Sequence, residues 1–276
     1  MLKTRVITAL ILLAVLLLAI FSGSSNTFAT LVAVFFAAAA WECQRLFRIQ
    51  FPIVGAAIWT AVFVFLAFAS SFRQSVLLFG VCIAIWLIRL TPSLRFGLPA
   101  LDGLANRLLC SVYGVAIFGA FIAILSLYHR SPTYMLSVMA IVWIADIGAY
   151  FSGKAFGKRK LAPSISPGKS WEGAIGGALF VLLAGGLTIA VPAFSDIFND
   201  TFTVQVYLTW GWGGLFAALI IMTALSVVGD LFESQLKRRA GMKDSSALLP
   251  GHGGVLDRVD ALIPVLPFAV FIAYWM

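Results

Sequence analysis

Long apolar runs separated by short polar stretches make up most of the chain. Runs of this kind, with few charges, are typical of membrane-crossing helices, which need about 20 residues each. We therefore predict an all-α, polytopic integral membrane protein with about nine transmembrane helices. Several of the nine are shorter than a perpendicular span requires. Their approximate bounds are residues 6–21, 27–41, 52–70, 75–88, 108–128, 133–152, 171–192, 207–228 and 261–275.

The composition supports a membrane protein and excludes an ordinary soluble domain. Hydrophobic residues make up 62% of the chain and the mean hydropathy is +1.03, more than a soluble core of this size needs. No repeat or low-complexity linker divides the sequence. We predict a single membrane-embedded domain over residues 1–276. Residues 1–130 would form N-terminal helices, and residues 131–276 would supply the helices and cytoplasmic loops of an active site.

The distribution of Lys and Arg predicts a cytoplasmic N-terminus. With nine spans in that orientation, the inside loops hold 17 of the 19 basic residues, and only Arg73 and Arg130 fall outside. The net charge of +8 does not predict nucleic-acid binding, because the bases are spread over short loops where they would contact anionic membrane lipids. An alternative is that residues 6–21 are a signal peptide after Lys3 and Arg5. The lack of a clear A-x-A site favours an uncleaved helix.

Charged residues are concentrated in one stretch, Ser234–Asp260, which lies between two apolar segments and hence at a membrane face. Just before and within it, Asp230, Glu233, Ser234 and Lys237 are spaced to share one face of a helix, provided that the preceding span continues through them. This face would present carboxylates and an ammonium group at the water boundary. The alternative is a solvated helix end with an internal ion pair.

The segment GHGGVLDRVD, residues 251–260, has the composition of a phosphate-binding turn. Gly253 and Gly254 can expose backbone N–H groups, and Arg258 supplies further donors. Asp257 and Asp260 are spaced to share a helical face, and Asp257 could complete a Mg²⁺ site with Asp230 across the loop. A hydrogen bond from His252 to a phosphate or a loop carbonyl is favoured over acid–base work, because no multi-histidine site can be assembled.

A third candidate region runs from Asp146 to Gly173. Asp146 lies inside the predicted membrane edge, where an unpaired carboxylate is costly and is usually functional. Tyr150 follows on the same helical face, and Lys169 lies in the later SPGKS turn, from which it could reach a phosphate. Lys158 and its basic neighbours have the alternative role of anchoring the helix to anionic head groups. Carboxylates and bases on one side of an apolar bundle indicate phosphoryl or nucleotidyl transfer onto a lipid.

The stretch Ser234–Asp260 resembles the signature of the phosphatidate cytidylyltransferase (CDP-diacylglycerol synthase) family. The second region, DIGAYFSG followed by a basic stretch, an SPGKS turn and WEG, is similar to another recurring segment of that family. The matching signature positions are Ser234, Leu236, Lys237, Arg238, Lys243, Asp244, Ser246, Leu249, Pro250, His252, Gly253, Gly254, Val255, Asp257, Arg258, Val259 and Asp260.

This resemblance implies transfer of CMP from CTP to phosphatidic acid, giving CDP-diacylglycerol and pyrophosphate, with Mg²⁺ and room for a second cation. It also implies the bacterial inner membrane as the location, with the active site facing the cytoplasm, and a homodimer is a further expectation. The implied catalytic residues are Asp230, Asp257 and Lys237, and the implied metal ligands are Asp230, Asp257, Asp260 and Asp146. The implied substrate-binding residues are Ser234, Arg238, Lys243, His252, Gly253, Gly254, Arg258, Lys169 and Tyr150.

Three other functions remain open at this point. A CTP-dependent lipid kinase would need many of the same residues. An ion-coupled transporter would use Asp146 and Asp230 as intramembrane carboxylates, although these acids cluster near one face. A non-catalytic lipid-binding scaffold would tolerate loss of the Asp257 charge.

Overall fold

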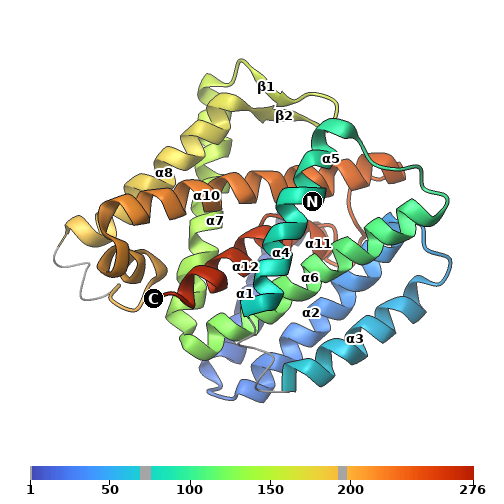
Figure 1. Cartoon of the computed structure of the whole chain (residues 1–276), viewed down its shortest axis with the longest axis horizontal. Helices are drawn as coiled ribbons and strands as arrows, with labels where there is room; N and C mark the ends of the chain where they lie inside the picture. The colour runs from blue at the N-terminus through green and yellow to red at the C-terminus, as the bar shows by residue number, and fades with distance from the viewer. Residues whose placement is uncertain (1, 69–75, 192–197) are drawn as a thin grey trace.

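A computed structural model describes residues 2–68, 76–191 and 198–276. Regular structure in this part of the chain is almost entirely helical, which confirms the predicted class (Figure 1). The elements are α1 (Leu2–Phe21), α2 (Ser25–Leu46), α3 (Pro52–Phe68), α4 (Val76–Ile85), the π-helix η2 (Trp86–Leu90), α5 (Thr91–Phe96), α6 (Leu104–Arg130), α7 (Pro132–Phe156), β1 (Lys160–Ala162), β2 (Ser166–Ser170), α8 (Trp171–Ala190), α10 (Phe202–Ala240), α11 (Leu256–Val259) and α12 (Leu262–Ala273).

Six helices in the described residues are long and apolar enough to cross a membrane. They are Ser25–Leu46, Val76–Phe96, Leu104–Arg130, Pro132–Phe156, Trp171–Ala190 and Phe202–Ala240. Three further apolar helices are shorter, namely Leu10–Phe21, Pro52–Phe68 and Leu262–Ala273. Each predicted segment overlaps one of these nine helices, but nine complete spans and a cytoplasmic N-terminus stay predictions. Arg73, one of the two bases placed outside, lies beyond the described residues.

Local sequence signals explain where several helices begin and end. The Ser24 hydroxyl accepts a hydrogen bond from the Thr27 N–H (3.2 Å) and begins α2. Ser131 does the same for the Tyr134 N–H (3.3 Å), with Pro132 in the first turn of α7, where its missing N–H costs nothing. At the other end of α10, Gly241 has φ +75°, the left-handed conformation that commonly ends a helix.

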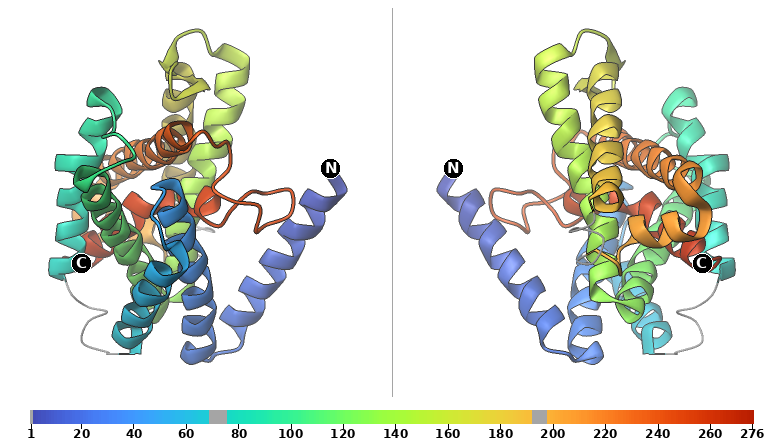
Figure 2. Two further views of the ribbon diagram at one scale, coloured as in Figure 1. Left: turned by 90° about the vertical axis from the view of Figure 1, so that its right-hand side faces the viewer. Right: turned by 90° about the vertical axis from the view of Figure 1, so that its left-hand side faces the viewer.

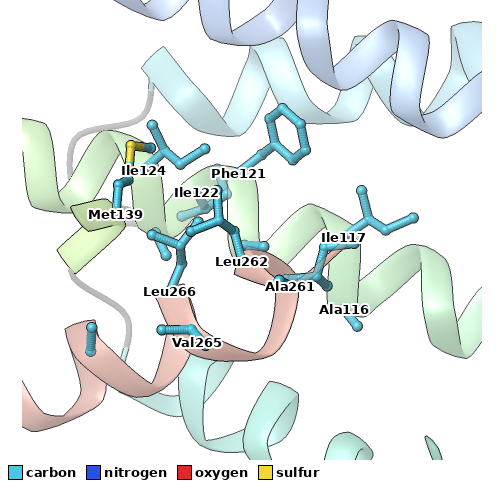
Figure 3. Packing of buried hydrophobic residues seen from close by; sticks show 14 of the residues in the cluster. Ala116, Ile117, Phe121, Ile122, Ile124, Met139, Ala261, Leu262, Val265 and Leu266 are labelled. Atoms are coloured by element: carbon cyan, nitrogen blue, oxygen red, sulfur yellow. The ribbon is translucent and has the colours of Figure 1, made fainter. Parts of the chain in front are cut away.

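Helix α6 lies at the centre of the core and is buried on several faces. Figure 3 shows its residues Ile117 and Ile122 beside Ala261 and Leu262, where α12 begins, while the Phe121 ring points away from that helix. The α6 sequence is apolar all round, as expected for a helix surrounded by other helices rather than lying at a water-exposed surface. This packing fixes α12, and with it the chain segment that leads into α12 from the polar stretch.

Helices α7 and α8 pack closely because glycines line their contact. A Cβ added at Gly177 would lie 2.6 Å from the Ala145 carbonyl oxygen, and one at Gly173 would lie 2.9 Å from that of Ala149. Small residues at such positions let two membrane helices approach. The small residues of Gly173–Gly177 therefore serve a helix contact within the chain.

Helix α10 extends beyond the predicted span of residues 207–228. It is kinked at Gly211, where φ is +65°, and then continues past Asp230 to Ala240 (Figure 1). The helix continues because its polar residues beyond 228 find partners on neighbouring elements. Between α7 and α8, a short antiparallel hairpin of β1 and β2 interrupts the helical structure, a feature that the sequence pattern did not predict.

Helix α1 leans away from the rest of the bundle, and the loop before α11 reaches toward it (Figure 2). The Thr8 hydroxyl donates to the Pro250 carbonyl oxygen of that loop (2.9 Å). Large side chains along α1, such as Leu18, are exposed, as expected for a helix that faces lipid.

Candidate active site

A cavity of about 700 Å³ gathers charged residues from three distant parts of the chain. It lies where α7, the β-hairpin, α8 and α10 meet the segment around α11 (Figure 1). The charged residues that line it are Asp146, Lys154, Lys169, Asp230, Lys237, Asp244, Asp257, Arg258 and Asp260. The convergence predicted from the sequence is therefore present, because all four proposed metal-ligand aspartates face one space.

Helix α10 supplies Asp230 to this cavity. The Asp230 carboxylate forms an ion pair with Lys169, which β2 carries from the other side. The Ser234 hydroxyl, one turn further along α10, donates to Asp230 Oδ1 (3.3 Å). The predicted helical face is thus real, and Ser234 acts on the Asp230 carboxylate rather than lining the cavity itself.

Lys237 lies between two carboxylates. It forms ion pairs with Glu233, one turn earlier on α10, and with Asp257 Oδ1 (2.6 Å) of α11. Glu233 is completely buried, so its ion pair with Lys237 is shielded from water. Removing one member of a buried ion pair leaves the other charge uncompensated. Lys237 therefore holds α10 and α11 in register at the cavity wall.

Asp257 organises the loop before α11. Its Oδ2 accepts hydrogen bonds from the Ser245 N–H (2.8 Å), the Ser245 hydroxyl (2.9 Å) and the Gly254 N–H (2.8 Å). Burial would raise the pKa of Asp257, but the hydrogen bonds from Lys237 and from Gly254 outweigh it and lower the pKa below its usual range. The carboxylate is held ionised, and both of its oxygens already have donors.

Glu42 on α2 is a site residue that the sequence reasoning missed. It is completely buried, and its carboxylate accepts four hydrogen bonds from the loop and from the start of α11. The donors are the Ser245 hydroxyl (3.1 Å), the Ser246 hydroxyl, the Val255 N–H (3.0 Å) and the Leu256 N–H (2.6 Å). A lone carboxylate at the end of an apolar segment, in WECQRL, was the available signal.

Asp260 lies just after α11 and accepts a hydrogen bond from the Ala261 N–H (2.7 Å). Burial raises the pKa of the Asp260 carboxyl to about 7, and the negative charge of nearby Asp230 contributes to the rise. The charges of Asp230 and Asp260 therefore repel each other within one cavity. A bound cation would relieve this repulsion.

In metal-free detergent solution, the melting temperature is expected to fall as the pH rises from about 4 to about 7. In that range the folded protein holds the Asp260 proton more tightly than the unfolded chain does, so rising pH favours unfolding. The full effect is at most roughly 4 kcal/mol. Melting curves of the wild type and of Asp260→Asn at several pH values measure the effect. The variant should lose the part of the fall in melting temperature that is due to Asp260. Parallel pH dependence of the two proteins would contradict the assignment.

The cavity has the donor chemistry that Mg²⁺ prefers, but it is not a ready-made metal cage. Across the described ranges, no three His, Cys, Asp or Glu side chains lie close enough together to hold a metal by themselves. Mg²⁺ commonly takes one or two carboxylates and completes its shell with water and substrate phosphates. Asp230 and Asp260, whose charges interact, fit that requirement in the described structure.

A model of the cytidylyltransferase family matches residues 3–276. The chain belongs to this family. A phosphatidate cytidylyltransferase of Haemophilus influenzae is 35% identical over 297 residues, which cover all of both chains. One of Pseudomonas aeruginosa is 40% identical over 283 residues, covering all of this chain and 99% of the relative. One of Bacillus subtilis is 38% identical over 164 residues, 59% of this chain and 56% of the relative.

Membership of the cytidylyltransferase family confirms the resemblance carried by the signature stretch. The structure brings some of the implied substrate-binding residues to the cavity and leaves others outside it. Tyr150, Lys169 and Arg258 line the cavity. The residues that do not line it are Ser234, Arg238, Lys243, His252, Gly253 and Gly254.

Two of these outer residues have structural roles in this member of the cytidylyltransferase family. The Gly254 N–H, predicted to hold a phosphate, donates to Asp257 instead. Gly253 has φ +82°, and a Cβ there would lie 2.6 Å from Asp257 Oδ2, so only glycine fits the turn. The glycines therefore shape the Asp257 network, and direct phosphate contact by their backbone stays a prediction.

Proposed function

We propose that this protein transfers CMP from CTP to phosphatidic acid, producing CDP-diacylglycerol and pyrophosphate for phospholipid biosynthesis. The observation that carries the proposal is the cavity in which the four proposed metal-ligand aspartates and several basic side chains face one another at the edge of an apolar helical bundle. Relatives matched over their full length bear the name phosphatidate cytidylyltransferase. A lipid substrate accounts for an active site built between membrane helices, and a triphosphate accounts for its bases.

In this reaction an oxygen of the phosphatidate phosphate attacks the α-phosphorus of CTP. The bond from that phosphorus to the oxygen bridging to the β-phosphorus breaks, and pyrophosphate leaves with the electron pair. The attacking phosphate is already anionic at neutral pH, so no strong general base is needed. The side chains instead neutralise charge and align the reactants.

The basic residues of the cavity suit that work. Lys169 approaches from β2 and Arg258 from α11, so the two place positive charge on different walls of the same space. Charge placed in advance around a transferring phosphoryl group stabilises the transition state without reorganisation. Lys237, held between Glu233 and Asp257, would keep its position while substrates enter.

Mg²⁺ would be held by Asp230 and Asp260, with Asp146 and Asp257 on the same cavity wall and room for a second cation. When bound, it would neutralise the triphosphate and align it for in-line displacement. Asp257 would join the metal shell only by giving up one of its present donors. The ion pair between Lys169 and Asp230 would loosen as CTP binds, because the phosphates compete for the lysine.

The proposed location is the bacterial inner membrane, with the cavity facing the cytoplasm where CTP is available. The unequal distribution of Lys and Arg supports this orientation. A homodimer remains part of the proposal.

Labelled CTP distinguishes cytidylyl transfer from other activities. With purified protein, Mg²⁺ and phosphatidic acid in micelles, we expect label from the α-phosphate to appear in the lipid and label from the γ-phosphate to appear in pyrophosphate. Transfer of the γ-label to lipid would identify a lipid kinase and overturn the proposal. Transport across sealed vesicles without pyrophosphate release would identify a transporter instead.

A further inference from the structure

A second cavity, of about 650 Å³, lies apart from the proposed active site. It is formed by the C-terminal end of α2, the N-terminal end of α3 and residues 101–111, which comprise the turn before α6 and the beginning of that helix. The described residues that line the two cavities have no member in common. The second cavity therefore needs its own explanation.

The second cavity carries a net positive charge. Arg48 and Arg107 line it, against one carboxylate, Asp102, and all three side chains are exposed. Within the described part of the chain, Arg107 has no ion pair and no side-chain hydrogen bond. Two arginines against one carboxylate leave one uncompensated positive charge, which fits a ligand group with a single negative charge. Uncharged polar side chains also line the cavity, namely Gln44, Gln50, Asn106 and Ser111.

The walls of the second cavity are held in place by specific contacts. The Asn106 amide donates to the Phe47 carbonyl oxygen (2.8 Å) and to that of Leu101 (2.7 Å), which joins α6 to the end of α2. The Arg48 guanidinium donates to the Ala240 carbonyl oxygen at the end of α10 (3.1 Å). The cavity is thus a built feature and not a gap between loose loops.

Arg48 also has an unusual backbone. Its φ is +51°, and it is the only residue other than glycine with positive φ in the described structure. Glycine or asparagine normally occupies this left-handed position after a helix, because a larger side chain crowds the backbone. Backbone strain of this kind is often retained where the side chain is needed.

An apolar stripe leads away from the polar end of the second cavity. Phe51, Val54 and Ile58 are 64%, 57% and 61% exposed; Phe51 directly precedes α3, and the spacing continues through Val54 and Ile58 on one face of that helix. A ligand with a charged head and an apolar tail matches this arrangement, whereas a soluble anion would leave the stripe unused.

We propose that the second cavity binds a phospholipid with a monoanionic, hydroxyl-bearing headgroup of the phosphatidylglycerol type. The phosphate would lie between Arg107 and Arg48, the headgroup hydroxyls would meet the uncharged polar side chains, and an acyl chain would follow the stripe on α3. A zwitterionic headgroup would leave the positive charge of the cavity uncompensated. Basic cavities between membrane helices are a common way to bind anionic lipids.

Native mass spectrometry of the delipidated full-length protein tests this site. Phosphatidylglycerol, phosphatidylethanolamine with the same acyl chains, and soluble glycerol phosphate serve as the three probes. We expect phosphatidylglycerol to bind most tightly and Arg107→Gln to weaken it about tenfold, the loss of one charge-assisted contact. Arg95→Gln, at an exposed arginine outside both cavities, is the matched control and should bind like the wild type.

Three results would overturn the proposal. They are wild-type affinity in Arg107→Gln, equal binding of phosphatidylethanolamine, and displacement of the lipid by equimolar glycerol phosphate. Lipid bound in the first cavity contributes equally to Arg107→Gln and to the wild type, because Arg107 lies outside that cavity. The measurement contains no CTP, so its outcome is independent of the proposed transferase activity.

Arg48→Gly separates a ligand contact from a structural role. Glycine relieves the left-handed backbone but loses the bond to the Ala240 carbonyl, so we expect little net change in the melting temperature. The affinity for phosphatidylglycerol should fall nevertheless. A variant that binds this lipid like the wild type would contradict the proposal.

Discussion

Replacing Asp230 with asparagine is expected to lower CTP-dependent pyrophosphate release by about a hundredfold or more. Asp230 faces the cavity, pairs with Lys169 and accepts a hydrogen bond from the Ser234 hydroxyl. Asparagine keeps the shape of the side chain but removes the charge that would hold a cation against the triphosphate. Initial rates in detergent micelles with CTP, phosphatidic acid and Mg²⁺ provide the measurement.

Two comparisons make the Asp230→Asn result interpretable. Asp200→Asn changes an exposed acid outside the cavity and should keep wild-type turnover. The melting temperature of Asp230→Asn should stay close to that of the wild type, because Asp230 is partly exposed and its ion pair with Lys169 is not deeply buried. Wild-type turnover in Asp230→Asn would remove this residue from the proposed metal site.

Replacing Glu42 with glutamine is expected to lower the free energy of unfolding by about 2–4 kcal/mol. The buried carboxylate accepts hydrogen bonds from Ser245, Ser246, Val255 and Leu256. A glutamine amide presents N–H groups to some of these donors, so at least one buried donor is left without an acceptor. Thermal unfolding in detergent measures the loss.

Glu172→Gln is the matched control for Glu42→Gln. Glu172 also accepts hydrogen bonds from backbone N–H groups, those of Lys158 and Arg159, but these contacts are exposed to water. Its substitution should change the melting temperature little. If Glu42→Gln melts like the wild type, the loop before α11 does not depend on the Glu42 carboxylate.

The turnover of Glu42→Gln provides a second test of the role of Glu42. Glu42 holds residues of the loop before α11. The same loop supplies the Ser245 N–H and the Gly254 N–H, which donate to Asp257, and Asp257 pairs with Lys237. Disorder in the loop would therefore displace cavity residues that Glu42 never touches. We expect Glu42→Gln to lose activity at temperatures well below its melting point.

The sequence carried much of the information about the candidate site. The spacing of Asp230, Ser234 and Lys237 predicted a shared helical face, and the structure has α10 running through all three. The intramembrane position of Asp146 marked it as a candidate, and it lines the cavity. These inferences succeeded because helical periodicity and the cost of a charge in lipid are local properties.

Other features of the site could not be predicted from residues that are neighbours in the sequence. Glu42 and Ser245 are separated by 203 positions, and nothing near either residue indicates the other. The glycines of residues 251–254 suggested a phosphate-binding turn, yet the Gly254 N–H is taken by Asp257. A donor's partner depends on which acceptor packing brings nearest, and that is settled only when the helices assemble.

The sequence by itself determined that the protein is built of apolar helices, that most candidate site residues lie in two polar stretches, and that these stretches match one enzyme family. Hydropathy, helical periodicity and short motifs depend only on residues close together in the sequence, so they can be recognised without knowledge of the fold. The tertiary structure alone decided which charges share a cavity, because helices packed through Gly173, Gly177 and the α6 core set distances that no local pattern encodes.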